Sequence, residues 1–519
     1  MNRDKYIQQL RDDPEIWDFI IIGGGATGLG TAVEAASRGY KTLLLEQHDF
    51  SKGTSSRSTK LVHGGVRYLR QGNVALVLEA LRERGLLRHN APHLVKNQSF
   101  IVPNYDWWEG PFYGIGLKIY DKLAGDLGLG PSKRLSKSEV LKYIPTLESE
   151  GLDGGVIYHD AQFDDSRLAI NLLQTLFDQG GFGLNYLKVT SLQKANKLVS
   201  GVEAKCQESG ESFEIQGRVI VNATGVFTDS IRKMDNKKVD SIIQPSQGVH
   251  IVLDKSFQPG ESAIMVPKTD DGRVLFAVPW HDKIIVGTTD TPVESPTLEP
   301  RAKDEEIEFL LTHAARYLTK DPEPKDVLSV FAGLRPLVSP SGSKNTSSIS
   351  RDHSLIIDPS GLVTITGGKW TTYRKMAEDT VDEAAVVAGL DERKSVTENL
   401  RLHGWLKNTE AAEPYEMYGS DALALKKIGQ EQDGWEVPLH PNLQCKPTEV
   451  LWAVRSEMAR TVEDVLARRT RSLLLDARAS MEIAEPVADL MALEMNKDDQ
   501  WKKQQVADYK ELANGYLLS

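Results

Sequence analysis

The chain has 519 residues, of which 40% are hydrophobic and 26% charged, so it can bury a large core and global disorder is excluded. Its formal net charge of −11 disfavours nucleic acid as the main partner, because such binding depends on neutralising phosphates. Two cysteines, Cys206 and Cys445, are too few and too far apart for a disulfide scaffold, a Cys-rich zinc site or a CxxC redox pair.

No stretch reaches the roughly 18 consecutive apolar residues of a membrane span. Residues 1–17 contain no apolar signal core. Two free thiols suit a reducing compartment, and the length suggests roughly two to four domains. We therefore expect an intracellular protein that is soluble or lies on a membrane surface without crossing it.

The first strong signal lies in residues 17–50. Phe19–Ile22 is continuously apolar, as in a strand buried on both faces. Three glycines follow in the spacing G-x-G-x-x-G: Gly23, Gly25 and Gly28. Residues 29–38 are compatible with a helix, and a second apolar run, Thr42–Leu45, ends at Glu46. This order predicts a Rossmann-type unit whose helix N-terminus binds a pyrophosphate and whose Glu46 accepts hydrogen bonds from a ribose.

This unit could bind NAD or FAD, and the segments that follow favour FAD. Residues 51–68 contain a run of hydroxyls with Lys60 that could wrap a pyrophosphate, and then His63-Gly64-Gly65, which would let the backbone lie against a flat ring. Buried strands ending in small-residue turns are predicted at 218–225 and 362–368, and a helix opens at 369–374. Its N-terminus could stabilise the negative charge of a reduced flavin. No second G-x-G-x-x-G follows a strand, so electrons must leave by a route other than a pyridine-nucleotide domain.

The remaining segments predict a second sheet and a helical C-terminal region. Residues 245–290 contain alternating strand-like pieces with turns between them, as in an antiparallel sheet. Residues 395–415 are polar and are predicted to be a linker. From residue 418 onward the pattern is helical, and in Val450–Leu466 an apolar residue recurs every four positions, which predicts a core-facing helix.

Several motifs occur in an order that resembles a known family. They are GGGATG, VHGGVRYL, DDSRL (164–168), NATG, PWHDKIIVGTTD (279–290), GLRPL (333–337), SRDH (350–353) and GGKWTTYR (367–374). Together they resemble the FAD-dependent glycerol-3-phosphate dehydrogenases, within the glutathione-reductase and D-amino-acid-oxidase flavoprotein superfamily. The likeness covers roughly residues 15–385 and resumes at 418–420 and 457–475.

The resemblance implies an α/β fold: a Rossmann-type FAD-binding domain, a mixed α+β substrate cap domain and a C-terminal helical domain. The expected boundaries are 1–95, 155–240 and 330–390 for the FAD-binding domain, 96–154 and 241–329 for the cap, and 395–519 for the helical domain. The implied reaction is oxidation of sn-glycerol 3-phosphate to dihydroxyacetone phosphate by hydride transfer to FAD, in glycerol metabolism. An amine or amino-acid oxidase of the same superfamily and a non-redox flavin-binding module remain as alternatives.

The resemblance also implies a quinone as electron acceptor, with oxygen left open. We expect a cytoplasmic protein in peripheral contact with the inner membrane surface, a possible homodimer, and no nucleic-acid partner. Candidate membrane-contact surfaces are residues 105–120, which are rich in aromatics, and the basic cluster of Arg468, Arg469 and Arg471, which could alternatively pair with nearby aspartates.

The glycine motif, the hydroxyl run and the resemblance together give the candidate cofactor contacts: Gly23, Gly25, Ala26, Thr27, Gly28, Glu46, Thr54, Ser55, Ser58, Lys60, Leu61, His63, Gly64, Gly65, Val189, Ala223, Thr224, Gly225, Gly368 and Thr371. The resemblance gives the candidate substrate contacts: Arg67, Tyr68, Thr288, Arg335 and Lys369. No metal site is expected.

The candidate catalytic residues are His250, Arg335 and Lys369. His250 can titrate near neutral pH and is the first candidate for the base, with a buried structural histidine as the alternative. Arg335 stays protonated, so it can polarise a hydroxyl but cannot easily take its proton. Lys369 becomes a second candidate for the base if its pKa is depressed.

Overall fold

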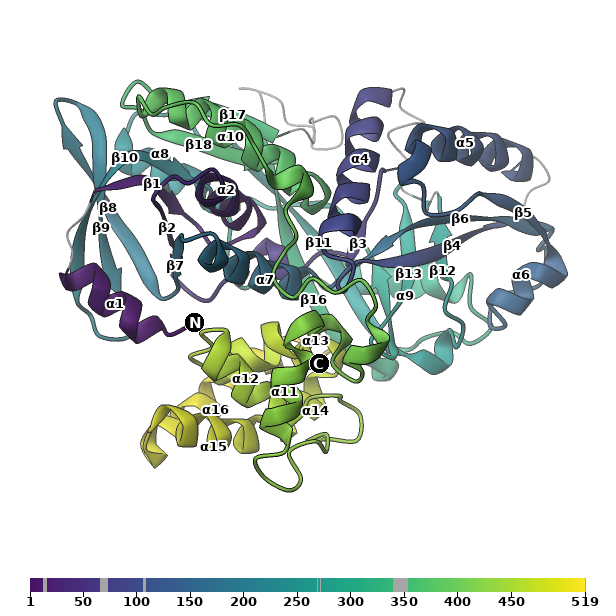
Figure 1. Cartoon of the computed structure of the whole chain (residues 1–519). Helices are drawn as coiled ribbons and strands as arrows, with labels where there is room; N and C mark the ends of the chain where they lie inside the picture. The colour runs from purple at the N-terminus through teal and green to yellow at the C-terminus, as the bar shows by residue number, and fades with distance from the viewer. Residues whose placement is uncertain are drawn as a thin grey trace.

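A mostly parallel sheet forms the centre of one half of the molecule (Figure 1). The computed structural model describes residues 1–12, 16–65, 73–105, 109–267, 269–270, 272–338 and 353–518. The sheet has the order β17-β18-β10-β1-β2-β7, and β18, β10, β1, β2 and β7 run parallel. The strands are β1 (Trp17–Ile22), β2 (Thr42–Leu45), β7 (Phe182–Leu184), β10 (Ser212–Asn222), β17 (His353–Ile357) and β18 (Val363–Gly367).

Strand β1 is apolar at successive positions because both of its faces are covered. Phe19 and Ile21 pack against a helical layer formed by α2 (Ala26–Ser37), α7 (Asp165–Asp178) and α10 (Tyr373–Val387). Ile20 and Ile22 point to the other face, toward β8 (Leu187–Ala195) and β9 (Leu198–Cys206). Two further helices border this half of the molecule: α1 (Arg3–Asp12) and α8 (Thr228–Asp235). The predicted Rossmann-type fold is therefore confirmed.

A second, ten-stranded sheet lies beside the first and is mostly antiparallel (Figure 1). Its strands are β3 (Leu61–Val62), β4 (Lys96–Asn104), β5 (Lys133–Ser136), β6 (Gly154–Gln162), β11 (Ile243–Asp254), β12 (Ala263–Val266), β13 (Leu275–Trp280), β14 (Lys283–Gly287), β15 (Thr291–Pro292) and β16 (Val327–Val338). The predicted antiparallel pairing within residues 245–290 is confirmed, since β14 pairs with both β11 and β13. Strands β6 and β16 pair along their lengths with β4 and β11, so this sheet extends past the expected boundaries of the cap at residues 154 and 329.

Within the described residues, four helices accompany this second sheet. They are α4 (Val74–Asn90), α5 (Glu109–Ala124), α6 (Lys137–Tyr143) and α9 (Asp304–Ala315). Helix α9 contributes Leu310 and Ala314 to a buried cluster with β11 and β14. Helices α4 and α5 contact each other at the outer edge, as Figure 1 shows.

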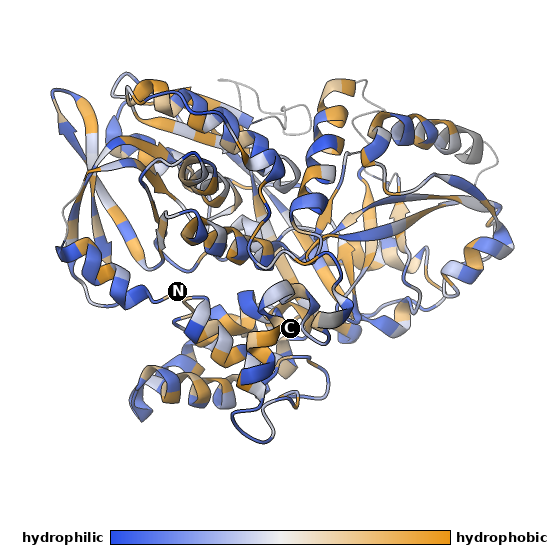
Figure 2. Ribbon diagram, viewed as in Figure 1, coloured by the Kyte–Doolittle hydropathy of each residue, from blue (hydrophilic) through white to orange (hydrophobic). Residues whose placement is uncertain are grey.

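The C-terminal region is helical, and it packs against the junction of the two sheets (Figure 1). Its helices are α11 (Ala422–Gly429), α12 (Pro447–Ser456), α13 (Ser472–Leu475), α14 (Ala477–Glu482), α15 (Ala484–Met495) and α16 (Asp499–Asn514). Polar and apolar residues alternate along the helices of this bundle (Figure 2), and many of the apolar ones form one buried cluster.

The continuous helix expected over Val450–Leu466 is interrupted. Helix α12 ends at Ser456, Met458 adopts a left-handed conformation with φ of 55°, and a π-helical turn, η11, spans Asp464–Arg469. The Asp464 carboxylate accepts hydrogen bonds from the backbone N–H groups of Arg460 and Thr461, which starts the new turn. Val450, Val462 and Leu466 of the apolar stripe share one core, whereas Met458, between the two helical pieces, packs in the core beside β1. Among the described residues, no helix is long and apolar enough to cross a membrane.

Candidate active site

A cavity of about 770 Å³ lies between the two sheets, at the carboxyl ends of β1, β2, β10 and β18. Ligands of open α/β sheets bind at this edge, in the crevice outside the strand ends. The loop after β2 covers one side of the cavity, and β11 and β16 reach it from the second sheet. The lining thus joins the loop residues Glu46, Gln47 and His48 to two strand residues that are distant in sequence, His250 on β11 and Arg335 on β16.

The glycine turn between β1 and α2 forms one end of the cavity. Gly23 has a φ of 111°, and a Cβ atom at Gly28 would lie 1.8 Å from the carbonyl oxygen of Gly23, so strand and helix approach closely only because both are glycines. Gly25, at the N-cap of α2, has no side chain with which to cap the helix. The first-turn N–H groups lie at the cavity, where the Ser55 hydroxyl accepts one bond, from the Ala26 N–H at 2.9 Å. This arrangement suits a phosphate group.

Glu46 lies at the end of β2 and lines the same cavity. Its carboxylate accepts hydrogen bonds from the backbone N–H groups of Gly24 at 2.7 Å and His48 at 2.8 Å. Burial raises the pKa of Glu46 despite these two bonds. A carboxylate at this position fits the ribose of a dinucleotide.

Two further glycine-containing turns border the cavity at this end, where Ala223 lies against Gly23. The turn after β18 holds Gly367 and Gly368, with φ values of 80° and 70°, and Gly225, with a φ of 58°, follows β10. A Cβ atom at Gly225 would meet no other atom within 4 Å, so there is room for a flat group to approach this backbone. The indole N–H of Trp370 donates to the Ser55 carbonyl at 2.9 Å, which ties this end to the loop after β2. The residues around the cavity therefore fit an FAD.

His250 reaches the cavity from β11. Its ring stacks on Phe331 with centroids 4.8 Å apart, and its Nε2 lies 2.9 Å from the hydroxyl of Thr59. A Cβ atom at Gly287, its partner on β14, would lie 2.2 Å from the imidazole, so only glycine leaves space for the ring. His250 is 2% exposed, and burial, with help from Lys60 and Arg335, lowers its pKa well below the ordinary value. The imidazole is thus neutral in the neutral pH range.

Arg335 lies on β16, paired with Ser246 of β11. Its guanidinium donates to the Asp290 carboxylate at 3.2 Å, to the Thr288 hydroxyl at 3.3 Å and to the Thr289 carbonyl at 3.0 Å. These contacts explain how an arginine is accommodated in the apolar segment FAGLRPLV. Lys369 also lines the cavity, at the N-cap of the turn η7 (Trp370–Thr372). The cavity lining therefore includes cationic groups that suit an anionic ligand.

Most of the residues singled out in the sequence line this one cavity. They are Gly23, Gly25, Ala26, Thr27, Glu46, Thr54, Ser55, Ser58, Leu61, His63, Gly65, Val189, Ala223, Thr224, Gly225, His250, Thr288, Arg335, Gly368, Lys369 and Thr371. Arg67 and Tyr68 lie outside the described residues.

Three expected cofactor contacts lie away from the cavity lining. Gly28 packs against Gly23, and Gly64 donates its N–H to the Tyr120 hydroxyl at 2.8 Å. The Lys60 ammonium is buried and bonds to Asp165 at 2.7 Å and to the Ser56 carbonyl at 2.8 Å, so it is directed away from a pyrophosphate. Burial lowers the pKa of Lys60 to about 8.

Several residues that line the cavity or contact its side chains are not singled out by any sequence motif. Arg57 is buried there and pairs with Glu299 at 2.7 Å, and Asp290 holds Arg335. Thr59 contacts His250. Arg57 and Thr59 lie inside the hydroxyl-rich run, and Asp290 is the last residue of the motif PWHDKIIVGTTD. The sequence motifs therefore identify the segments that reach the cavity, but they do not identify which side chain of each segment contacts it.

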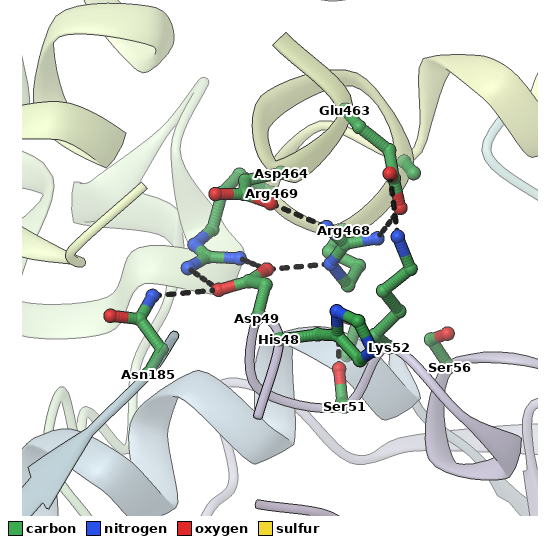
Figure 3. A network of polar contacts seen from close by, with 12 residues as sticks. His48, Asp49, Ser51, Lys52, Ser56, Asn185, Glu463, Asp464, Arg468 and Arg469 are labelled. Atoms are coloured by element: carbon green, nitrogen blue, oxygen red, sulfur yellow. Dashed lines mark hydrogen bonds and ion pairs between the residues drawn. The ribbon is translucent and has the colours of Figure 1, made fainter. Parts of the chain in front are cut away.

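The expectation that Arg468, Arg469 and Arg471 form a membrane-binding patch is wrong. All three are buried, with exposures of 2%, 1% and 1%. Figure 3 shows Arg468 and Arg469 directed at Asp49 of the loop after β2. Arg471 pairs with Asp165 at 2.9 Å. The alternative of pairing with a nearby aspartate is confirmed for Arg468, which also contacts Asp464 at 2.6 Å. Because all three cations are buried and paired, none is available to a lipid headgroup.

Comparisons with known proteins agree with this geometry. Residues 18–374 match the family of FAD dependent oxidoreductases, and residues 362–502 match the C-terminal domain of alpha-glycerophosphate oxidase. The chain is 40% identical to the mitochondrial glycerol-3-phosphate dehydrogenase of Mus musculus, over 97% of this chain and 74% of that protein. It is 40% identical to the mitochondrial enzyme of Arabidopsis thaliana, over 97% of this chain and 86% of that protein.

Solved structures show the same likeness. The glycerol-3-phosphate dehydrogenase of Bacillus halodurans, complexed with FAD, superposes with a TM-score of 0.80 at 29% identity, over 99% of this chain and 97% of that one. A glycine oxidase from Geobacillus kaustophilus shares the fold at 18% identity with a TM-score of 0.53, over 74% of this chain and 98% of that one.

Proposed function

Because the chain belongs to the family of FAD-dependent glycerol-3-phosphate dehydrogenases, we propose that it oxidises sn-glycerol 3-phosphate to dihydroxyacetone phosphate. It is a flavoprotein oxidoreductase whose cofactor is FAD. The observation that carries the proposal is the meeting of a neutral imidazole, His250, with the cation of Arg335 in the cavity that fits FAD. Oxidising an alcohol that carries a phosphate needs both kinds of group.

The glycine turn and Glu46 would hold the diphosphate and ribose of FAD, and the turns at Gly225 and Gly368 would border the flavin. When bound, FAD supplies the electron chemistry by accepting a hydride from the substrate carbon. The protein contributes position, charge and proton transfer.

The phosphate of the substrate is a dianion and needs cations. Arg335 supports this role because Asp290, Thr288 and the Thr289 carbonyl fix its planar guanidinium at the cavity. Lys369 lines the same space and adds a second cation. Arg67 and Tyr68 complete the substrate contacts that the family resemblance implies.

The hydroxyl of the substrate must lose a proton as the carbon loses its hydride. His250 is our candidate for the base, because its imidazole is neutral and borders the cavity. Thr59 holds its Nε2 and restricts the rotation of the ring. Lys369 remains the second candidate.

We propose a membrane quinone as the electron acceptor, reached by peripheral contact through helices α4 and α5. The exposed side of α5 carries Ile115 and Ile119, which are 63% and 47% exposed, with Lys118 and Lys122 one turn away. Val74 and Leu78 are exposed on α4, which contacts α5. An apolar stripe flanked by lysines suits an anionic lipid surface.

The inner side of α5 supports the same proposal. Tyr113 and Leu117 pack in one apolar cluster with Phe100, Tyr158 and Met265, and these last three residues line the cavity. A quinone that enters beneath α5 would therefore meet apolar side chains on its way to the flavin.

The test of the function is anaerobic mixing of the purified protein with sn-glycerol 3-phosphate while the flavin absorbance is followed. We expect the yellow colour to bleach, and glycerol to be far less effective, because each charge-assisted hydrogen bond to the phosphate contributes about 1.5–3 kcal/mol. Equal rates with glycerol would refute the phosphate site. Faster bleaching by an amino acid would favour the oxidase alternative.

A further inference from the structure

The C-terminal helical region contacts the cofactor half of the molecule, which is the half built around the parallel sheet, through a buried network of ion pairs (Figure 3). At its centre is Asp49, which follows Glu46 in the loop after β2. Arg469 donates to both carboxylate oxygens of Asp49, at 2.7 and 2.9 Å, and Arg468 donates to one of them at 2.5 Å. Both arginines belong to the π-helical turn η11, a type of turn that is frequent at functional sites.

The network continues to the rim of the cavity. Glu463 accepts hydrogen bonds from Lys52 at 2.7 Å and from Arg468 at 2.6 Å, as Figure 3 shows. Lys52 and His48 line the cavity, while Asp49 between them points to the C-terminal region. The loop after β2 is thus bound from one side by η11 and borders the cofactor cavity with its other side.

A second anchor lies a few residues further along the same loop. The Arg471 guanidinium donates to the Ser56 carbonyl at 2.7 Å and to the Asp165 carboxylate at 2.9 Å. The other oxygen of Asp165 accepts from the backbone N–H and the hydroxyl of Ser58, at 3.0 and 2.7 Å. Arg471 therefore fixes residues 56–58, next to Thr54 and Ser55, which line the cavity.

These contacts hold the loop firmly because the charges are buried. Asp49 and Arg469 are 0% and 1% exposed. Burial alone would raise the pKa of Asp49, but Arg469 and Arg468 outweigh it and hold the pKa below its ordinary value. Removing one partner would leave an uncompensated buried charge, which is strongly unfavourable, so the loop would shift away from its present position.

We propose that Arg468, Arg469 and Arg471 are positioning residues for the cofactor: through Asp49 and Ser56 they hold the loop of residues 47–59 in the shape that retains FAD. The C-terminal region is then part of the FAD site without lining the cavity. Linkage makes the effect reciprocal, so bound FAD also strengthens the docking of η11. The proposal rests on FAD as the ligand but not on the identity of the substrate.

The first test compares three variants by the dissociation constant of FAD, measured by titrating apoprotein with FAD. We expect Arg469→Met to bind FAD about tenfold or more weakly and Arg469→Lys to recover part of the loss. Met491→Ala, in the core of the C-terminal region, should lower the melting temperature but leave FAD binding unchanged. An unchanged dissociation constant in Arg469→Met, or an equal loss in Met491→Ala, would overturn the proposal.

The second test uses the wild-type chain and does not depend on a variant that folds. Hydrogen exchange of residues 463–475 is compared with and without FAD, and residues 499–514 of α16 serve as the control. We expect FAD to slow exchange in the first segment and to leave the second unchanged. Equal exchange of residues 463–475 in both states would overturn the proposal. Because neither test uses the substrate, a failure here is distinct from a failure to oxidise glycerol 3-phosphate.

Discussion

His250 is the single side chain whose replacement tests the proposed mechanism most directly. We expect His250→Gln to slow anaerobic flavin reduction by about 10²–10⁴-fold, the usual effect of removing a general base. Burial lowers the pKa of His250 well below its ordinary value, so the wild-type rate should stay level as the pH falls through the neutral range. The fall in rate at acidic pH, the acidic limb of the profile, should appear only below the neutral range.

Arg335→Lys is the matched control for this experiment. It keeps the charge beside His250 but loses the planar fork, so the rate should fall while the acidic limb remains. The substrate phosphate titrates near pH 6 in every variant, so only a difference between the two profiles reports on the protein. If His250→Gln keeps the wild-type limb, the base lies elsewhere and Lys369 is the next residue to replace.

Residues near each other in sequence are the ones that sequence reasoning can assign. The glycine turn and Glu46 lie within one strand–helix–strand unit, so their spacing alone indicates a dinucleotide site. The contact between Asp49 and Arg469 joins positions 420 apart, and nothing local in either segment signals it. For this reason the sequence leaves open whether the arginine cluster is exposed or paired with nearby aspartates, whereas the structure shows it to be buried.

The segment between α10 and α11 is fastened by His403. Its Nδ1 lies 2.7 Å from Asp178 at the end of α7, and its Nε2 lies 3.0 Å from Asp421 just before α11. Burial lowers the pKa of His403, but the hydrogen bonds to the two aspartates outweigh it and raise the pKa to about 9. The imidazolium thus joins the cofactor half of the molecule to the C-terminal region.

This element should make stability depend on pH. Because folding raises the pKa of His403 from 6.5 to about 9, its contribution is complete below pH 6.5 and is lost as the pH rises through 9. We expect the melting temperatures of wild type and His403→Gln to differ most near pH 6.5 and to converge as the pH approaches and passes 9. His440→Gln, whose partner Glu482 is exposed, is the control. A constant difference would contradict the assignment.

Elements with strong periodicity are predicted better than their ends. Strand β2 has the predicted bounds, Thr42–Leu45, whereas α2 begins at Ala26 and not at residue 29, because Gly25 already serves as the N-cap. The interruption after α12 could not be read from the apolar stripe, since both helical pieces face the same core. It depends on Asp464, whose side chain binds backbone groups that an uninterrupted helix would have satisfied.

On the scale of the whole molecule, the exposed stripe of α5 should govern attachment to lipid. We expect the double variant Ile115→Asp and Ile119→Asp to bind vesicles of anionic phospholipid less than wild type, since its stripe can no longer bury apolar surface. Flavin reduction by glycerol 3-phosphate should be unchanged, while electron transfer to a quinone in the vesicle should slow. Leu493→Asp, at an exposed site on α15, should bind as wild type does. Equal binding by all three proteins would refute the proposed surface.

The ion pair between Asp49 and Arg469 can form only after both residues have been synthesised. A ribosome adds roughly 5–20 residues per second, so the 420 positions between these two residues take about 20–80 s to make. Throughout that interval the nascent loop after β2 has its carboxylate but neither of the arginines that will hold it. The glycine turn is made before Asp49, yet the cofactor site is complete only after Arg468 and Arg469 have been added.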